Sequence, residues 1–142
     1  MESPLLGLIL DSSVIIAAER KRQTIEQLLM SVSQAFGEIE IAISAVTLAE
    51  LVHGVARANT PEIRHSRRSF IDELKRHVPV HAVTDSTAEI AGQISGEQGA
   101  KGITLPADDL LIGASALEQG YAVVTLNTRH FQMIPGLLVL SI

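Results

Sequence analysis

Short apolar runs alternate with longer segments of helical periodicity along most of this chain, and this alternation limits the possible folds more than any other feature. Residues 5–10 are apolar without the polar alternation of a half-exposed strand, which predicts a first strand buried on both faces. Four further strands are expected at residues 39–44, 78–83, 121–126 and 137–142. Because helical segments separate these strands, the connections are right-handed crossovers and the sheet is parallel.

Helix signals fill the intervals between the strands. Thr24 and Gly37 are typical of the start and the end of a helix, and Pro61 is expected at the first position of another. Gly120 is expected to end a helix in the left-handed conformation. The expected helices cover residues 14–21, 25–36, 45–58, 61–77, 84 or 85 to about 95, and 106–119. We therefore expect an α/β fold: a three-layer α/β/α sandwich around a central, mostly parallel five-stranded sheet.

Composition excludes several classes of protein. The 142 residues are 46% apolar, which is enough to build the core of one domain over residues 1–142. Cysteine is absent, which excludes disulfide frameworks, thiolate zinc sites and cysteine nucleophiles. Glu2 stands where a signal peptide carries basic residues, and residues 5–10 are too few to span a membrane, so we expect a cytoplasmic protein without membrane contact.

Three acidic residues are expected where the strands end, which is where α/β proteins bind their ligands. Asp11 follows the first strand directly, although an aspartate in this position is also a common helix N-cap. Glu50 lies off the apolar stripe of its helix, and Asp109 lies in the first turn of another. Gly54 and Gly113 follow these two acids by four residues, a spacing that leaves room beside each carboxylate for a ligand or another helix.

Carboxylates gathered without histidine or cysteine are the ligand set that suits Mg²⁺ or Mn²⁺. Clustered carboxylates repel one another, and a divalent cation removes that conflict. Such an ion also lowers the pKa of a bound water for in-line attack on a phosphodiester. Asp108 is open to two interpretations, as the cap of its helix and as a further acid of the site.

Four short segments carry a resemblance to a known family. They are DSS at 11–13, TLAELVHG at 47–54, DLLIGASA at 109–116 and TLNTRHF at 125–131. In this order, and over nearly the whole chain, they resemble the signature blocks of PIN-domain proteins, in particular the VapC-type toxins. The resemblance implies a metal-dependent endoribonuclease of a type II toxin–antitoxin system, with Mg²⁺ or Mn²⁺ as cofactor and structured RNA such as tRNA or rRNA as substrate. It also implies a cognate VapB-type antitoxin as partner and a homodimer.

Carried over by position, the resemblance assigns metal binding and catalysis to Asp11, Glu50 and Asp109. It assigns hydrogen-bonding support to Ser12, Ser13, Thr125 and Asn127. Many relatives carry a fourth acid where this chain has Asn127, and an amide oxygen is a weaker, uncharged ligand. The number of metal ions, one or two, therefore stays open.

The net charge is −5, so an RNA substrate must meet a local basic patch. Between residues 57 and 77 six basic side chains face three acidic ones. Arg64, Arg67 and Arg68 recur there at helical spacing and are predicted to contact RNA phosphates, although a solvated helix face would show the same pattern. His53 can approach Glu50 from the next turn, whereas the other histidines have no ligand spacing and are expected at the surface or partly packed.

Two other functions compete with RNA cleavage. A PIN-fold module that binds RNA or a protein partner without cutting would show the same segments. Phosphoryl-transfer proteins of the receiver or haloacid-dehalogenase type also place an aspartate after the first strand. The dehalogenase type needs a second aspartate where this chain has Ser13, and both types need a lysine that residues 121–142 do not contain.

Overall fold

The computed structural model describes residues 5–142, so the expectation drawn from Glu2 lies outside the described residues. Five parallel strands form one sheet in the order β3-β2-β1-β4-β5. The strands are β1 (Gly7–Leu10), β2 (Glu40–Ser44), β3 (Val80–His81), β4 (Tyr121–Thr125) and β5 (Val139–Ser141). The expected α/β class with five strands is confirmed, and the sheet is parallel throughout.

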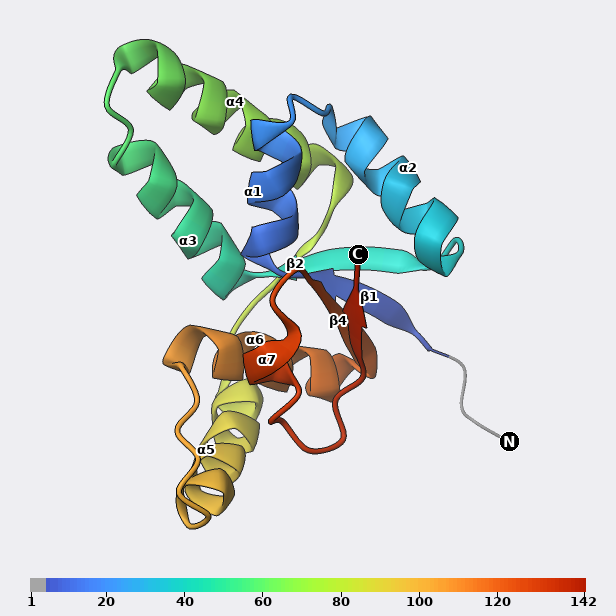
Figure 1. Ribbon diagram of the computed structural model, residues 1–142, viewed down its shortest axis with the longest axis vertical. Helices are drawn as coiled ribbons and strands as arrows, with labels where there is room; N and C mark the ends of the chain where they lie inside the picture. The colour runs from blue at the N-terminus through green and yellow to red at the C-terminus, as the bar shows by residue number, and fades with distance from the viewer. Residues whose placement is uncertain (1–4) are drawn as a thin grey trace.

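Helices cover both faces of the sheet and complete the three layers (Figure 1). One face carries α1 (Ser12–Arg20), α2 (Ile25–Phe36), α3 (Ala45–Ala56) and α4 (Pro61–His77), and the other carries α5 (Asp85–Gly99), α6 (Ala107–Gln119) and α7 (Thr128–Phe131). Leu8 and Leu10 of β1 pack into the first layer and Ile9 into the second. Burial on both faces explains why β1 lacks polar alternation. Within residues 5–142, no helix is both long enough and apolar enough to cross a bilayer.

The local helix signals are confirmed. The Thr24 hydroxyl accepts a hydrogen bond from the Gln27 amide while the Gln27 side chain accepts one from Thr24, which is a complete capping box. Pro61 stands in the first turn of α4, and Gly120 ends α6 with φ of 72°. Each of these signals acts within a few residues, so it needs no tertiary contact.

Several helix limits depend instead on tertiary contacts. The expected end of the fifth helix near residue 95 is wrong, since α5 continues through two further glycines to Gly99. Near this end Gln98 is buried, and its amide donates to the Met133 carbonyl at 2.6 Å, a contact that favours helix here despite the low propensity of glycine. The Met133 carbonyl that accepts this hydrogen bond lies two residues after α7, a short helix that the sequence does not predict.

The carboxyl ends of the central strands position the functional side chains. From β1 the sheet extends to β2 on one side and to β4 on the other, so a crevice is expected where β1 and β4 end. The Asp11 amide donates to the Val124 carbonyl at 2.9 Å, which continues the β1–β4 pairing by one residue. Asp11 therefore lies directly beside the end of β4. We call this side of the sheet the carboxyl edge.

Candidate active site

Asp11 is held at the carboxyl edge by two hydroxyl groups. Its Oδ2 accepts hydrogen bonds from Ser13 Oγ at 2.8 Å and from Thr125 Oγ1 at 2.9 Å, and the residue is only 6% exposed. Within residues 5–142 no protein group donates to Oδ1. Asp11 occupies the N-cap position of α1, but its side chain makes no capping hydrogen bond, so the capping interpretation of this carboxylate is wrong.

The backbone after β4 orients both supporting hydroxyls. The Asn127 amide donates to Thr125 Oγ1 at 2.9 Å, and the Leu126 amide donates to Ser13 Oγ at 3.1 Å. Each hydroxyl has a single proton, which it donates to Asp11 Oδ2 while it accepts a hydrogen bond from one of these amides. Asn127 thus contributes through its backbone, while its side chain is exposed and does not cap α7.

Glu50, on the second turn of α3, carries the least compensated charge at the carboxyl edge. Ser12 Oγ donates a long hydrogen bond of 3.4 Å to Oε2, whereas Oε1 is buried and has no hydrogen-bond partner within residues 5–142. Burial, and then the charges of Asp11 and Asp108, raise the pKa of Glu50 to about 7 against the opposing effect of Ser12. The protein itself therefore leaves this carboxylate in need of a cation or a proton.

Asp109 lies in the first turn of α6 and is held by a histidine. Its Oδ2 lies 2.8 Å from Nδ1 of His130, a residue of α7. Burial raises the pKa of Asp109, as does the charge of Asp11, and the hydrogen bond from His130 opposes this rise. The sequence placed His130 among histidines without a ligand role. One feature of the sequence could have indicated a role for His130: it lies five residues after Thr125, on the segment that follows β4 at the same edge of the sheet.

Asp108 does not cap its helix. The N-cap position of α6 is Pro106, and among the described residues no side chain makes the capping hydrogen bond. The exposed Asp108 instead lines a hollow of about 450 Å³ together with Glu50 and His53. Its charge contributes to the raised pKa of Glu50, so Asp108 belongs to the acidic surroundings of the site.

The two glycines that follow the acids serve different purposes. A side chain at Gly54 would meet no atom of residues 5–142 within 4 Å, which agrees with the open space expected beside Glu50. A side chain at Gly113 would collide with Ile134 and approach Leu137 to 3.3 Å. Gly113 therefore permits close packing of α6 against the chain after α7, and it leaves no space for a ligand.

The donors at the carboxyl edge fit a hard divalent cation. Asp11, Glu50 and Asp109 offer carboxylate oxygens, and the unpartnered Glu50 Oε1 is a buried polar atom that such an ion would satisfy. These three acids do not converge closely: within residues 5–142, three donor atoms lie within 4.8 Å of one another only at Glu26, Glu73 and His77. An open set of carboxylates suits Mg²⁺ or Mn²⁺, because such ions keep several water ligands.

Glu26, Glu73 and His77 form a separate ion-pair network between α2 and α4. His77 Nε2 lies 2.9 Å from Glu73 Oε1 and 3.2 Å from Glu26 Oε1. Arg76 contacts the second oxygen of Glu73 at 2.6 Å, and these charges and hydrogen bonds lower the pKa of Glu73. Its three donor atoms lie within 4.8 Å of one another, on α2 and α4 rather than directly after a strand.

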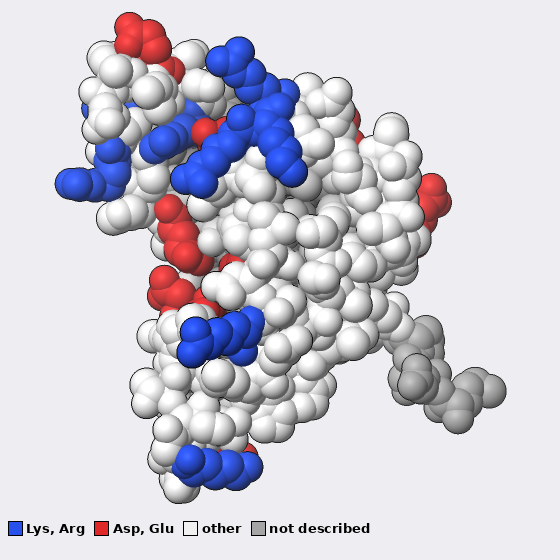
Figure 2. Space-filling model, in the orientation of Figure 1, with Lys and Arg blue, Asp and Glu red and all other residues white. Residues whose placement is uncertain are grey.

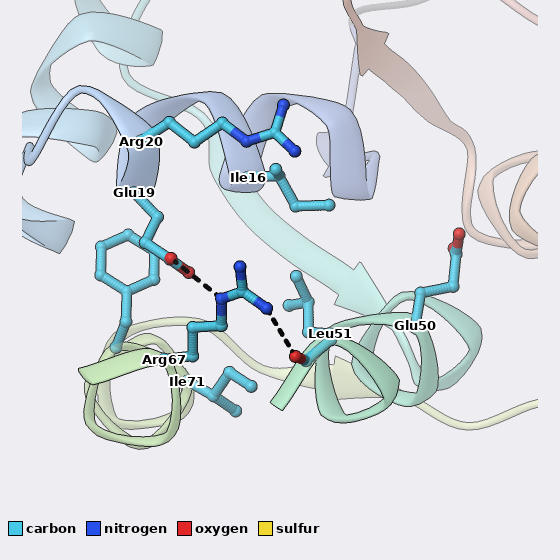
Figure 3. Close-up of a pocket in the computed structure, with 9 residues that line it drawn as sticks. Ile16, Glu19, Arg20, Glu50, Leu51, Arg67 and Ile71 are labelled. Atoms are coloured by element: carbon cyan, nitrogen blue, oxygen red, sulfur yellow. Dashed lines mark hydrogen bonds and ion pairs between the residues drawn. The ribbon is translucent and has the colours of Figure 1, made fainter. Parts of the chain in front are cut away.

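Basic side chains of α1 and α4 gather on the surface in what we call the basic patch (Figure 2), and Arg67 of α4 points inward from it (Figure 3). Figure 2 shows Lys and Arg side chains gathered over α1 and α4, above acidic side chains where the α3 and α6 layers meet. Arg67 points into a cavity of about 150 Å³ between α1, α3 and α4 (Figure 3). Its Nη1 donates to the Gly54 carbonyl at 2.7 Å, and its Nε lies 3.7 Å from Glu19. Arg64 and Arg68 remain exposed on α4.

Comparisons with known proteins agree with this architecture. Residues 8–137 match the family described as PIN domain. The chain is 33% identical over 137 residues to Ribonuclease VapC1 of Rickettsia felis, covering 96% of this chain and 97% of that protein. It is 29% identical over 135 residues to the tRNA(fMet)-specific endonuclease VapC of Shigella flexneri, covering 94% and 96%.

Solved structures show the same fold. VapBC2 from Rickettsia felis bound to a promoter DNA fragment matches with a TM-score of 0.83 at 23% identity, covering 96% of this chain and 98% of that chain. DNA-bound VapBC from Salmonella typhimurium matches with a TM-score of 0.80 at 25% identity and the same coverage of 96% and 98%.

Proposed function

Because the chain belongs to the PIN-domain family, and within it to the VapC-type ribonuclease toxins of VapBC systems, we propose that it cleaves RNA at Asp11, Glu50 and Asp109 with Mg²⁺ or Mn²⁺. The observation that carries this proposal is Glu50 Oε1, which is buried and has no hydrogen-bond partner within residues 5–142. Burial, and then the charges of the neighbouring carboxylates, raise the pKa of Glu50. When bound, the cation supplies an acidified water for in-line attack and stabilises the charge on the leaving oxygen.

The residues divide the remaining work. Asp11 and Asp109 each keep one oxygen in protein hydrogen bonds and offer the other to the cation. Glu50 Oε1, which lacks a partner within residues 5–142, would also face the cation. The attacking water would lose its proton to solvent. The new phosphorus–oxygen bond would replace the bond to the ribose oxygen, which would leave with a proton taken from solvent. Asn127 contributes no charge, so we propose that one ion suffices.

We propose structured RNA such as tRNA or rRNA as the substrate class. The relatives in Shigella flexneri and Salmonella typhimurium are named tRNA(fMet)-specific endonucleases, which makes initiator tRNA the first RNA to test. Arg64 and Arg68, exposed on α4, would contact phosphates, and Arg67 would support them by fixing α4 to its neighbours. A VapB-type antitoxin is a proposed protein partner, since the solved relatives include VapBC complexes. A second copy of the chain is proposed as a partner on the family resemblance of the sequence alone.

The test is cleavage of total RNA and of initiator tRNA by the purified chain with Mg²⁺, Mn²⁺ or EDTA, with the cut ends mapped. Cleavage is expected with either metal and not with EDTA. Asp11→Asn and Asp109→Asn should each lower the rate by at least about a hundredfold, the order expected when a group that stabilises the transition state is lost. Glu89→Gln, an exposed carboxylate on α5, is the matched control and should cleave normally.

Two outcomes would contradict the proposal in different ways. Full activity of Asp11→Asn would remove the carboxyl edge as the active site. A wild-type chain that binds RNA but cuts none with either metal would instead favour the non-catalytic module.

A further inference from the structure

We propose that His130 is the positioning residue of Asp109: its ring holds one carboxylate oxygen so that the other oxygen faces the cation. This inference rests on the proposed function and adds to it a residue that the sequence placed outside the site. It begins from one contact, the 2.8 Å separation of His130 Nδ1 and Asp109 Oδ2.

The direction of this hydrogen bond follows from chemistry. An ionised carboxylate only accepts hydrogen bonds, so Nδ1 of His130 carries the proton and donates it to Oδ2. Within residues 5–142, no other protein group donates to the Asp109 carboxylate. Removing the imidazole would leave both oxygens free to rotate about the Cβ–Cγ bond.

The helix that carries His130 is fixed from two sides. Phe131, the next residue, is 1% exposed, and Ile134 is 2% exposed and packs against Gly113 of α6. The buried Gln98 of α5 donates to the Met133 carbonyl at 2.6 Å. Because Gly113 and Asp109 share α6, these contacts hold α7 in place relative to the helix that bears the carboxylate. The imidazole is therefore a fixed support.

The same arrangement holds the other aspartate. Thr125, at the end of β4, donates to Asp11 Oδ2, and no group of the described residues donates to Oδ1. One segment of six residues, 125–130, thus supports both aspartates, with a hydroxyl at its start and an imidazole at its end. Partners that orient metal-binding carboxylates in this way typically change metal affinity by about 10- to 100-fold when they are removed.

The experiment measures Mn²⁺ affinity of the full chain by calorimetric titration, without RNA. His130→Ala should weaken binding by about 10- to 100-fold. His130→Asn places an amide nitrogen near the position of Nδ1, so it should restore affinity to within about threefold, whereas His130→Gln reaches the position of Nε2 and should not. His65→Ala removes an exposed histidine of α4 and should bind as the wild type does.

The ion-pair network between α2 and α4 must not contribute to the measured Mn²⁺ affinity. All titrations are run in a His77→Ala background, because Glu26, Glu73 and His77 could bind Mn²⁺ independently. Thermal unfolding in EDTA is measured for each variant. A purely structural role of His130 would lower the melting temperature and leave Mn²⁺ affinity unchanged, and this result would overturn the inference.

The remaining outcomes separate the two proposals. If Mn²⁺ binding is absent, or is unaffected by Asp11→Asn, the proposed metal site fails and the role of His130 fails with it. If Asp11→Asn abolishes binding while His130→Ala binds as tightly as the wild type, only the positioning role is wrong. Equal affinities of the Asn and Gln variants would also overturn it.

Discussion

Glu50 differs from the two aspartates in how its oxygens are used. Asp11 and Asp109 each have a short hydrogen bond to one oxygen, at 2.9 Å or less, whereas Glu50 receives only the 3.4 Å contact from Ser12. Its other oxygen is buried and has no partner in the part of the chain that the structure describes. The metal-free protein therefore carries an energetic cost at this residue whenever the carboxylate is charged.

That cost predicts a pH dependence of stability. The pKa of Glu50 rises from 4.5 to about 7 on folding, so its contribution is most favourable below pH 4.5 and is lost as the pH rises towards 7. The full shift would be worth about 3 kcal/mol, and solvent screening of a half-buried group reduces this to about 1 to 2 kcal/mol. In EDTA, Glu50→Gln should reduce the loss of unfolding free energy between pH 5 and pH 8 by this amount, as measured by urea denaturation. Equal losses in the two proteins would contradict this prediction.

At the scale of the secondary-structure elements, Arg67 connects three helices around one cavity. From α4 it reaches the last turn of α3 through the Gly54 carbonyl and the end of α1 through Glu19 (Figure 3). Glu50 lies one turn before Gly54 and lines the same cavity. The position of α3 at the carboxyl edge therefore depends partly on an arginine that the sequence groups with surface residues.

Neighbouring arginines should consequently behave differently. Arg67→Ala loses a charged hydrogen bond at a half-buried site and should destabilise the fold by about 1.5 to 3 kcal/mol. Arg68→Ala loses an exposed ion pair with Asp72 and should cost less than about 1 kcal/mol. Arg68→Ala should instead reduce the salt dependence of RNA binding, by about one in the slope of log K against log salt. Urea denaturation and RNA titrations check both, and equal stabilities would contradict the role given to Arg67.

The elements also show which parts of the structure were predictable from sequence. The limits of α2, α4 and α6 follow from caps and stops that act locally, such as Thr24, Pro61 and Gly120. The common edge of the three acids follows from the parallel topology, which places the carboxyl ends of all strands on one side. The helix α7 and the inward turn of Arg67 were not predictable, because both depend on partners distant in sequence.

At the scale of the whole molecule, opposite charges are separated. The net charge of −5 includes the acids of the carboxyl edge, while the basic side chains gather over α1 and α4 (Figure 2). RNA held at the basic patch would be directed towards the acids, but only after a cation has neutralised them. Metal binding should therefore also reduce the electrostatic repulsion between the carboxylates of the carboxyl edge in the folded protein.

This predicts that metal raises thermal stability. A hundredfold excess of free Mn²⁺ over its Kd stabilises the folded state by about 2.7 kcal/mol. For a domain of this size the melting temperature should rise by roughly 8 to 11 °C relative to EDTA. The double variant Asp11→Asn, Asp109→Asn should show little of this rise in a His77→Ala background. Scanning calorimetry measures both, and an equal rise in the variant would place the stabilising ion elsewhere.

The segment 125–130 has a consequence for synthesis of the chain. A ribosome makes Asp11 and Glu50 early, but Asp109 and the residues that hold both aspartates come in the last third of the sequence. The β4 strand, which places this segment beside β1, is also made late. The contacts that hold both aspartates therefore form only after the segment 125–130 has left the ribosomal exit tunnel, so a nascent chain lacks the assembled carboxyl edge until then.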